Sequence, residues 1–241
     1  MQIVPVTDIV IRMVPGAWPL PPELRAAVAD HWAAAVAVNP HLWDGRILGL
    51  SAVGGEPLVA GDGVLRAEAR EDAYSALLAW RSRGFPEIGV RHAFGWALIV
   101  SQDGALIYGV MGNHTANAGR VYPPGGSLEP RDVMPDGRVD YLRCVALELV
   151  EETGLSVAEA RVGMTVAILD HSVISVGQVL HFAEPAHKLV NRIRANLALQ
   201  QHRELADVVI VRSRADAEAA GCVPYAVALA EAFFAGRIFA E

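Results

Sequence analysis

The segment "LELVEETGL", Leu147–Leu155, carries three glutamates in five residues and is closed by a glycine. At 3.6 residues per turn, Glu148, Glu151 and Glu152 fall within about 100° of one another on a helix. Like charges at these spacings repel one another, so they require either a solvated face or a cation that offsets them. Gly154 is expected to take the left-handed conformation that ends the helix. The segment alone is compatible with both a solvated surface helix and a cation site.

The opposite arc of the same helix is apolar and is expected to pack inward. Its members are Leu142, Val145, Ala146 and Leu149.

Composition bounds the class of protein. The chain has 241 residues, of which 53% are hydrophobic, which is enough for a sizeable core. Its formal charge of −7, from 20 basic and 27 acidic residues, gives no overall attraction to nucleic acid or to an anionic membrane. We therefore expect neither a nucleic-acid polymer nor a membrane as a partner.

Cysteine usage and the N-terminus indicate a cytoplasmic protein. Cys144 and Cys222 lack the CxxC spacing of a zinc or redox site and are expected to be small core residues. The first residues lack the basic start and continuous apolar run of a signal peptide, and their pattern predicts a strand. No uninterrupted apolar stretch of about 18 residues predicts a membrane span.

The pattern of the chain changes near "RSRGFPEIG", Arg81–Gly89, where a glycine and a proline interrupt it. We predict an N-terminal α+β region over residues 1–88, either a separate domain or a lid, and a second domain over residues 89–241. The first region is expected to contain strands over 2–13, 46–53 and 64–69 and helices over 22–38 and 71–80.

The second region begins with "HAFGWALIV" and "GALIYGVMG", two apolar runs joined by "SQDG", which predict a hairpin. After the glutamate helix we expect strands over 161–170 and 172–183, a helix over 187–200, a strand over 206–211 and a helix over 224–235. Strands on both sides of the acidic helix predict a layered α/β/α arrangement.

The loop before the helix contains "VYPPGGSLEP", Val121–Pro130. Two consecutive glycines after two prolines allow the backbone to approach a ligand closely. Taken alone, the same pattern is also typical of an ordinary turn.

"GGSLEP" followed by "LELVEETGL" resembles the signature of the Nudix hydrolases, in which a glycine pair and a glutamate precede R-E-hydrophobic-x-E-E-x-G-hydrophobic. The helical half is matched at Glu148, Leu149, Glu151, Glu152, Gly154 and Leu155. The resemblance implies an α/β/α sandwich around a mixed sheet, here with an additional N-terminal α+β region. It also implies an enzyme that hydrolyses the pyrophosphate bond of a nucleoside diphosphate linked to another moiety.

The same resemblance implies a divalent metal site. Magnesium prefers oxygen ligands and bridges carboxylates to substrate phosphates, so glutamates clustered on a rigid helix suit it. We expect Glu148, Glu151 and Glu152 to bind Mg²⁺, with Mn²⁺ as an alternative. A backbone carbonyl of the glycine pair is expected to join them, from Gly126 or else from Gly125.

The general base is left open between a glutamate of the helix, Glu151 or Glu152, and Glu204 in "HRELADVV". Glu204 precedes a predicted strand, where its side chain either returns to the metal site or is simply solvated.

Three other residues are expected to contact the substrate. Arg120 precedes the glycine pair on an expected active-site strand, and Gly125 belongs to that pair. His114 lies in the preceding loop and is either a ligand contact or an ordinary polar loop histidine. The expected substrate is a small nucleotide derivative. Formation of a homodimer is left open.

Two positions depart from the signature. Leu147 stands where the family has an arginine, and Arg143 one turn earlier is either its substitute or an ordinary exposed arginine. The segment "RDVMPDGRVD" lengthens the loop, so the early acidic position falls on Val139 or, after a shift of one residue, on Asp140. We favour Asp140 as the N-cap of the helix.

The N-terminal segment "NPHLWDGRILGL", Asn39–Leu50, is similar to one in the branch related to UDP-glucose and UDP-galactose pyrophosphatase. That branch also tends to lose the signature arginine. The alternative for this segment is a turn followed by a buried strand. We therefore expect a UDP-sugar or similar nucleotide-sugar as the substrate. The alternative function is a catalytically weakened module that binds or senses a nucleotide.

Overall fold

The computed structural model describes residues 1–238, which form a mixed sheet of eleven strands. The main path runs β1-β9-β10-β5-β3-β4-β2, with β6, β7, β8 and β11 attached beside it. β10 is parallel to β5 and β2 is parallel to β4, whereas the other neighbours are antiparallel. The strands are β1 Gln2–Val6, β2 Asp8–Met13, β3 Arg46–Ser51, β4 Val64–Ala73, β5 Arg91–Val100, β6 Leu106–Met111, β7 Val121–Tyr122, β8 Gly125–Ser127, β9 Ala160–Leu169, β10 Val173–Phe182 and β11 Leu205–Val211.

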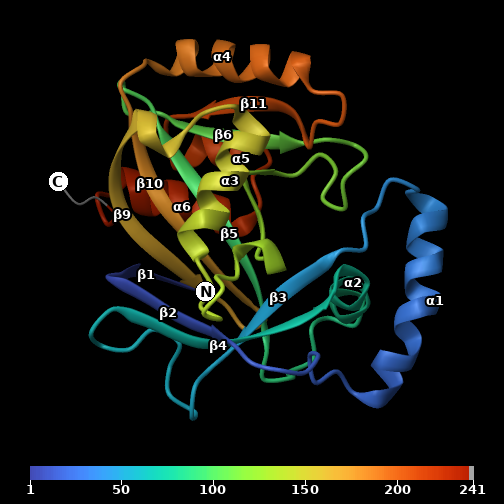
Figure 1. Cartoon of the computed structure of the whole chain (residues 1–241). Coiled ribbons are helices and arrows are strands. Elements are labelled where there is room, and N and C mark those ends of the chain that lie inside the picture. Colours follow the sequence, from blue (N-terminus) through green and yellow to red (C-terminus); the bar gives the residue numbers. More distant parts are fainter. Residues whose placement is uncertain (239–241) are drawn as a thin grey trace.

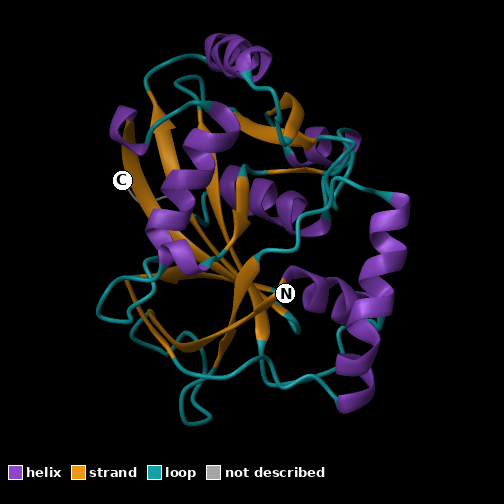
Figure 2. Cartoon of the chain, turned by 45° about the vertical axis from the view of Figure 1, so that its right-hand side comes forward, coloured by secondary structure: helices purple, strands orange, loops and turns teal. Residues whose placement is uncertain are grey.

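Helices cover both faces of the central strands, as Figures 1 and 2 show. In Figure 1, α3 crosses in front of β5, α5 and α6 lie behind it, and α4 lies along β11. One core cluster joins β5 and β6 to apolar residues of α3, α4 and α6. The predicted α/β/α arrangement around a mixed sheet is therefore confirmed. The helices are α1 Pro22–Val38, α2 Tyr74–Ser82, α3 Tyr141–Thr153, α4 Ala186–Leu199, α5 Arg214–Ala219 and α6 Pro224–Phe234.

Local chemistry sets both ends of α3. The Asp140 carboxylate accepts the backbone N–H of Arg143 at 3.0 Å, which makes it the N-cap. Gly154 ends the helix at φ 71°, in the left-handed region. Val145 and Leu149 are buried as predicted. The inward packing predicted for Leu142 is wrong, because in the first turn it faces an open hollow beside β2 and β9.

The N-terminal region is hydrogen-bonded into the same sheet as the rest of the chain. The predicted strand over 2–13 divides at Thr7: β1 pairs with β9, and β2 pairs with β4. β3 pairs with β5 through Gly49 with His92 and Leu50 with Arg91. Hydrogen bonding therefore continues across residue 88, and separate folding of residues 1–88 stays a prediction.

Two helices of this region form a flank with its own core, at the right of the sheet in Figure 1. α1 matches the predicted range, whereas α2 begins later than predicted because β4 continues to Ala73. Trp18 and Trp80 meet edge to face at a centroid distance of 5.8 Å. The buried Asp72 carboxylate accepts from the Arg25 guanidinium, at 2.6 Å for the shortest contact. This ion pair fixes α1 against the end of β4.

The glycine pair forms β8, a strand of three residues that lies on β5. Gly125 pairs with Trp96 and Gly126 pairs with Gly95. A Cβ on Gly125 would lie 2.1 Å from the carbonyl oxygen of Gly95, and one on Gly126 would lie 2.5 Å from the carboxyl carbon of Glu148. Both positions therefore exclude a side chain sterically.

Several short elements had no sequence pattern to predict them. The strands β7 and β8, the 3₁₀ turn over Pro130–Asp132 and the six-residue α5 are too short to show a period. No helix within residues 1–238 is long and apolar enough to cross a membrane.

Gly125→Ala is expected to destabilise the fold by about 1–3 kcal/mol or more, because the new methyl group would meet backbone that cannot rotate away. Urea denaturation measures the change. Gly61→Ala is the matched control, since nothing lies within 4 Å of its added Cβ. Equal stability of the two variants would contradict the tight packing of β8 on β5.

Candidate functional site

The end of α3 directs two carboxylates at β8. The Oε2 atom of Glu152 accepts the backbone N–H of Gly125 at 2.8 Å. Glu148 packs on Gly126, where the missing side chain leaves room for its carboxylate. Their exposed fractions are only 6% for Glu148 and 2% for Glu152. Two of the three helix glutamates are therefore buried against the sheet, and Glu151 alone has an exposed side chain.

Burial destabilises the charged form of these two carboxylates. It raises the pKa of Glu148 to about 8, although the Arg131 charge acts in the opposite direction. Burial, together with the charge of Glu148, raises the pKa of Glu152 well above its usual value. The Oε1 atom of Glu152 has no hydrogen-bond partner among the residues that the structure describes. Buried carboxylates with perturbed pKa values and an unpaired oxygen indicate a functional site.

Arg131, in the 3₁₀ turn Pro130–Asp132, supplies the positive charge beside these acids. Its guanidinium donates to Glu148 at 2.7 Å and to Glu151 at 2.7 Å. Its Nε atom lies 3.3 Å from a carboxylate oxygen of Glu129. Arg143 is exposed and makes no side-chain hydrogen bond or ion pair within residues 1–238, so the helix carboxylates are bridged from the loop and not from Arg143.

The turn that carries Arg131 is itself held by a buried acid. Asp132 is fully buried, and its Oδ2 atom accepts the backbone N–H of Glu129 at 2.9 Å. Asp132 and Arg131 were not predicted from the sequence, because the early acidic position was placed by counting back from the helix. Counting forward from the glycine pair would have reached this turn. Val139 and Asp140, the positions considered there, lie at the opposite end of α3.

A cavity of about 440 Å³ opens over the acidic cluster. It brings Glu204 and His114 together with Glu148 and Glu151, although these residues are far apart in the sequence. Partial burial and the charge of Glu151 raise the pKa of Glu204, while His114 acts in the opposite direction. The cavity is also lined by Arg131, Glu129, Gly125 and Gly126.

A second cavity, of about 500 Å³, lies beside the first and shares both glycines with it. Aromatic rings line it: Tyr225 lies 5.6 Å from Phe94 and 6.1 Å from Tyr122 between ring centroids. Arg120 lines this cavity and not the acidic one. Burial lowers the pKa of His92 to about 4, so its ring is neutral at pH 7, with Nε2 at 2.9 Å from the Ser127 hydroxyl.

The N-terminal segment reaches the acidic cavity. His41, Leu42 and Trp43 line it, and the Asn39 amide donates to the carbonyl oxygen of His114 at 2.9 Å. The segment continues into β3, whose strand residues are largely buried. The segment therefore leads into a buried strand, as the alternative predicted, and it also lines the acidic cavity. Its similarity to the UDP-sugar branch stays a prediction.

The donor set fits a hard divalent cation. Carboxylates and a backbone carbonyl are the ligands that Mg²⁺ and Mn²⁺ prefer, and the unpaired oxygen of Glu152 is a free donor. No group of three or more His, Cys, Asp or Glu side chains in residues 1–238 already converges for a metal ion. Arg131 instead engages both Glu148 and Glu151.

The ladder between β5 and β8 distinguishes the two glycine carbonyls. Leu128 donates to Ala93, and Ala97 donates to Pro124, at positions that flank the pair of Gly95 and Gly126. Since bonded pairs alternate in an antiparallel ladder, the Gly126 carbonyl faces β5 and that of Gly125 faces away. The thiol of Cys144 also lies 3.6 Å from the Gly126 carbonyl oxygen. This geometry favours Gly125 over Gly126 as the backbone ligand.

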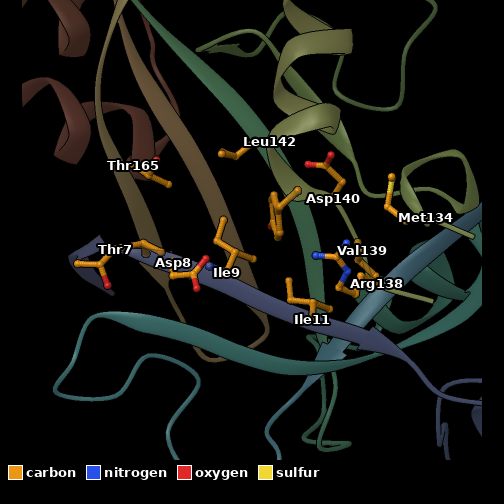
Figure 3. Close-up of a pocket in the computed structure, with 12 residues that line it drawn as sticks. Thr7, Asp8, Ile9, Ile11, Met134, Arg138, Val139, Asp140, Leu142 and Thr165 are labelled. Atoms are coloured by element: carbon orange, nitrogen blue, oxygen red, sulfur yellow. Dashed lines mark hydrogen bonds between the residues drawn. The ribbon is translucent and has the colours of Figure 1, made fainter. Parts of the chain in front are cut away.

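A third hollow, of about 330 Å³, lies at the start of α3 and is shown in Figure 3. Thr7, Asp8 and Ile9 form one side, with Arg138 and Asp140 opposite. Its charged groups already have local partners. Asp140 caps α3, Arg138 pairs with Asp136 and Asp8 accepts the N–H of Ile9. The glutamates of α3 do not reach it.

No protein-family model matches the chain, and no curated protein matches it either. Among solved structures, a Nudix hydrolase from M. smegmatis, RenU, shares 16% identity over 61% of this chain and 84% of its own, with a TM-score of 0.41. The Nudix domain of Shewanella oneidensis NrtR, complexed with ADP ribose, shares 15% identity over 64% of this chain and 91% of its own, with a TM-score of 0.40. A MutT protein from Methanosarcina mazei shares 19% sequence identity over 61% of this chain and 94% of its own, with a TM-score of 0.39. Likenesses with such low TM-scores establish neither a shared activity nor a shared ligand.

Glu152→Gln is expected to stabilise the metal-free protein by about 1–3 kcal/mol, because a neutral amide no longer buries a charge. A raised folded-state pKa means that the unfolded chain releases the proton first. The wild-type protein therefore loses stability as pH rises above the unfolded value near 4.5. The difference between variant and wild type should thus widen from about pH 5 to pH 8.

Thermal denaturation in EDTA measures this difference. Glu56→Gln, at an exposed loop glutamate, is the control and should change the midpoint little at any pH. A Glu152→Gln variant that is less stable than the wild type at pH 8 would show that the buried carboxylate is structural.

Proposed function

We propose that the protein is a divalent-cation-dependent hydrolase that cleaves the pyrophosphate bond of a nucleoside diphosphate linked to another moiety, a UDP-sugar or similar nucleotide-sugar. The observation that carries the proposal is the pair of buried carboxylates, Glu148 and Glu152, held against the glycine strand β8 with one oxygen unpaired. A structural role alone does not account for two buried acids of which only Glu148 has a positively charged partner within residues 1–238.

Glu148, Glu151 and Glu152 would hold Mg²⁺ or Mn²⁺, together with the backbone carbonyl of Gly125, which faces away from β5. Bound there, the cation would neutralise phosphate charge and lower the pKa of a bound water. Glu152 also fixes the strand, because its second oxygen holds the N–H of Gly125. The helix thus supplies ligands from a rigid element that cannot drift away from the glycine pair.

We assign the proton acceptor to Glu204 rather than to Glu151 or Glu152. Glu204 faces the acidic cavity, and partial burial raises its pKa, which makes its carboxylate a stronger base than an exposed glutamate. Glu152 lies behind the glycines and does not line that cavity. Glu151 is bound by Arg131 in this structure.

The two adjoining cavities support a nucleotide derivative as substrate. A base can stack on the aromatic rings around Tyr225, and the pyrophosphate then lies over the shared glycines in the acidic cavity. Arg120 lines the aromatic cavity, and there it would contact the phosphate that lies nearest to the base. The far side of the acidic cavity, lined by His41, Trp43 and His114, is where the sugar would lie.

A second candidate function is a module that binds or senses a nucleotide without turnover. The observation in its favour is Arg131, which already engages two of the three proposed metal ligands. Magnesium-dependent product formation separates the two candidates.

The test is a phosphate-release screen, coupled to a phosphatase, of UDP-sugars, ADP-ribose, dinucleoside polyphosphates and nucleoside triphosphates with and without Mg²⁺. We expect magnesium-dependent cleavage of a UDP-sugar into a nucleoside monophosphate and a sugar phosphate, and its loss in Glu148→Gln. Glu56→Gln is the control and should turn over normally. A folded protein that is silent on every compound would favour the binding module.

Glu204→Gln is expected to reduce kcat by about 100- to 10,000-fold, because the proton acceptor is lost while the proposed metal ligands remain. Its affinity for Mn²⁺, measured by calorimetry, should stay close to that of the wild type. Glu151→Gln should instead weaken Mn²⁺ binding. A Glu204→Gln enzyme with a normal kcat would show that Glu204 is not the general base and would favour Glu151 or Glu152 of α3.

A further inference from the structure

Arg131 occupies the centre of the acidic cluster. Its guanidinium lies 2.7 Å from a carboxylate oxygen of Glu148 and 2.7 Å from one of Glu151, with a further contact of 3.2 Å to the second oxygen of Glu151. Glu129 holds its Nε atom at 3.3 Å. Three carboxylates from two segments therefore share one positive charge.

These contacts take one carboxylate oxygen of Glu148 and both of Glu151, so Arg131 competes with a divalent cation for these carboxylates. A guanidinium and a dication cannot both take short contacts to Glu148 and Glu151, because the two cations repel each other strongly at such distances. The buried Oε1 atom of Glu152, which no described residue engages, is a metal-ligand atom that Arg131 does not reach. The cluster is thus neutralised only in part by the protein itself.

The backbone below Arg131 is fixed, whereas its side chain has room to move. The turn Pro130–Asp132 is closed by reciprocal bonds between Glu129 and the buried Asp132. The Arg131 side chain keeps 35% of its surface exposed and lines the acidic cavity. Rotation of one side chain, with Glu129 as the remaining partner, is enough to release Glu148 and Glu151.

We propose that Arg131 is a tethered counter-cation, which stabilises the metal-free cluster and is displaced from Glu148 and Glu151 when a divalent cation binds. The inference rests on the cation site of the proposed function. It differs from a brace, in which Arg131 would hold the carboxylates in their ligating positions and remain there. The exchange sets the divalent concentration at which the site fills.

Calorimetric titration with Mn²⁺ alone, on the full chain, distinguishes the two roles. Arg131→Met is expected to bind Mn²⁺ about ten-fold more tightly or better than the wild type, because the competing cation is gone. Its thermal midpoint in EDTA should be lower, since the glutamates then repel one another without compensation. Arg143→Met is the control. It removes an exposed arginine of α3 that makes no ion pair within residues 1–238, so its Mn²⁺ affinity and thermal midpoint should match those of the wild type.

Arg131→Lys keeps a charge but lacks the planar fork, so its Mn²⁺ affinity should fall between those of the wild type and Arg131→Met. It replaces Arg131→Met in the comparison if the latter does not fold. Unchanged or weaker Mn²⁺ binding in both variants would overturn the exchange and establish a brace. Absence of Mn²⁺ binding in every protein, the wild type included, would instead remove the cation site and the proposed function with it.

Discussion

The contact between the end of α3 and the glycine strand is the constraint on which the rest of the site depends. Glu152 holds the N–H of Gly125, and Glu148 fills the space that the absent side chain of Gly126 leaves. Both arrangements require glycine, since any Cβ would meet backbone or carboxylate. Helix and strand therefore fix each other, and the two buried acids are held without freedom to turn toward solvent.

The N-terminal region belongs to this arrangement in two ways. Its strands extend the sheet, because β3 pairs with β5 and β1 with β9. It also lines both cavities, through the His41–Trp43 segment on the acidic side and residues of α2 such as Leu77 and Arg81 on the aromatic side. A region that a minimal catalytic domain would lack thus shapes the space where the proposed substrate lies.

Local patterns in the sequence predicted most of the elements and the ends of α3. Asp140 and Gly154 act through neighbouring backbone, so adjacent residues suffice to predict them. Leu142 was misplaced, because a helical wheel does not show that the first turn overhangs a hollow. The burial of Glu148 and Glu152 could not be predicted from the helical pattern either. It depends on their packing against β8, a strand of three residues that is too short to show a hydrophobic period.

The partner of the glutamates could not be predicted from spacing either. Arg131 precedes Glu148 by 17 positions and reaches it only because the 3₁₀ turn folds back over α3. A family signature with arginine inside the helix directs attention to Leu147 and Arg143, whereas here the charge comes from the lengthened loop. Contacts of this kind depend on the path of a loop, which residue types alone do not determine.

The most direct test of the account is the position of Mn²⁺ in crystals of the protein, located by its anomalous scattering. The account predicts a peak at ligand distance from the carboxylates of Glu148 and Glu152, beside the glycine pair of β8. A well-ordered site without manganese, or manganese bound only elsewhere, would contradict it. The buried glutamates would then be a structural feature, and the proposed hydrolysis would lose its basis.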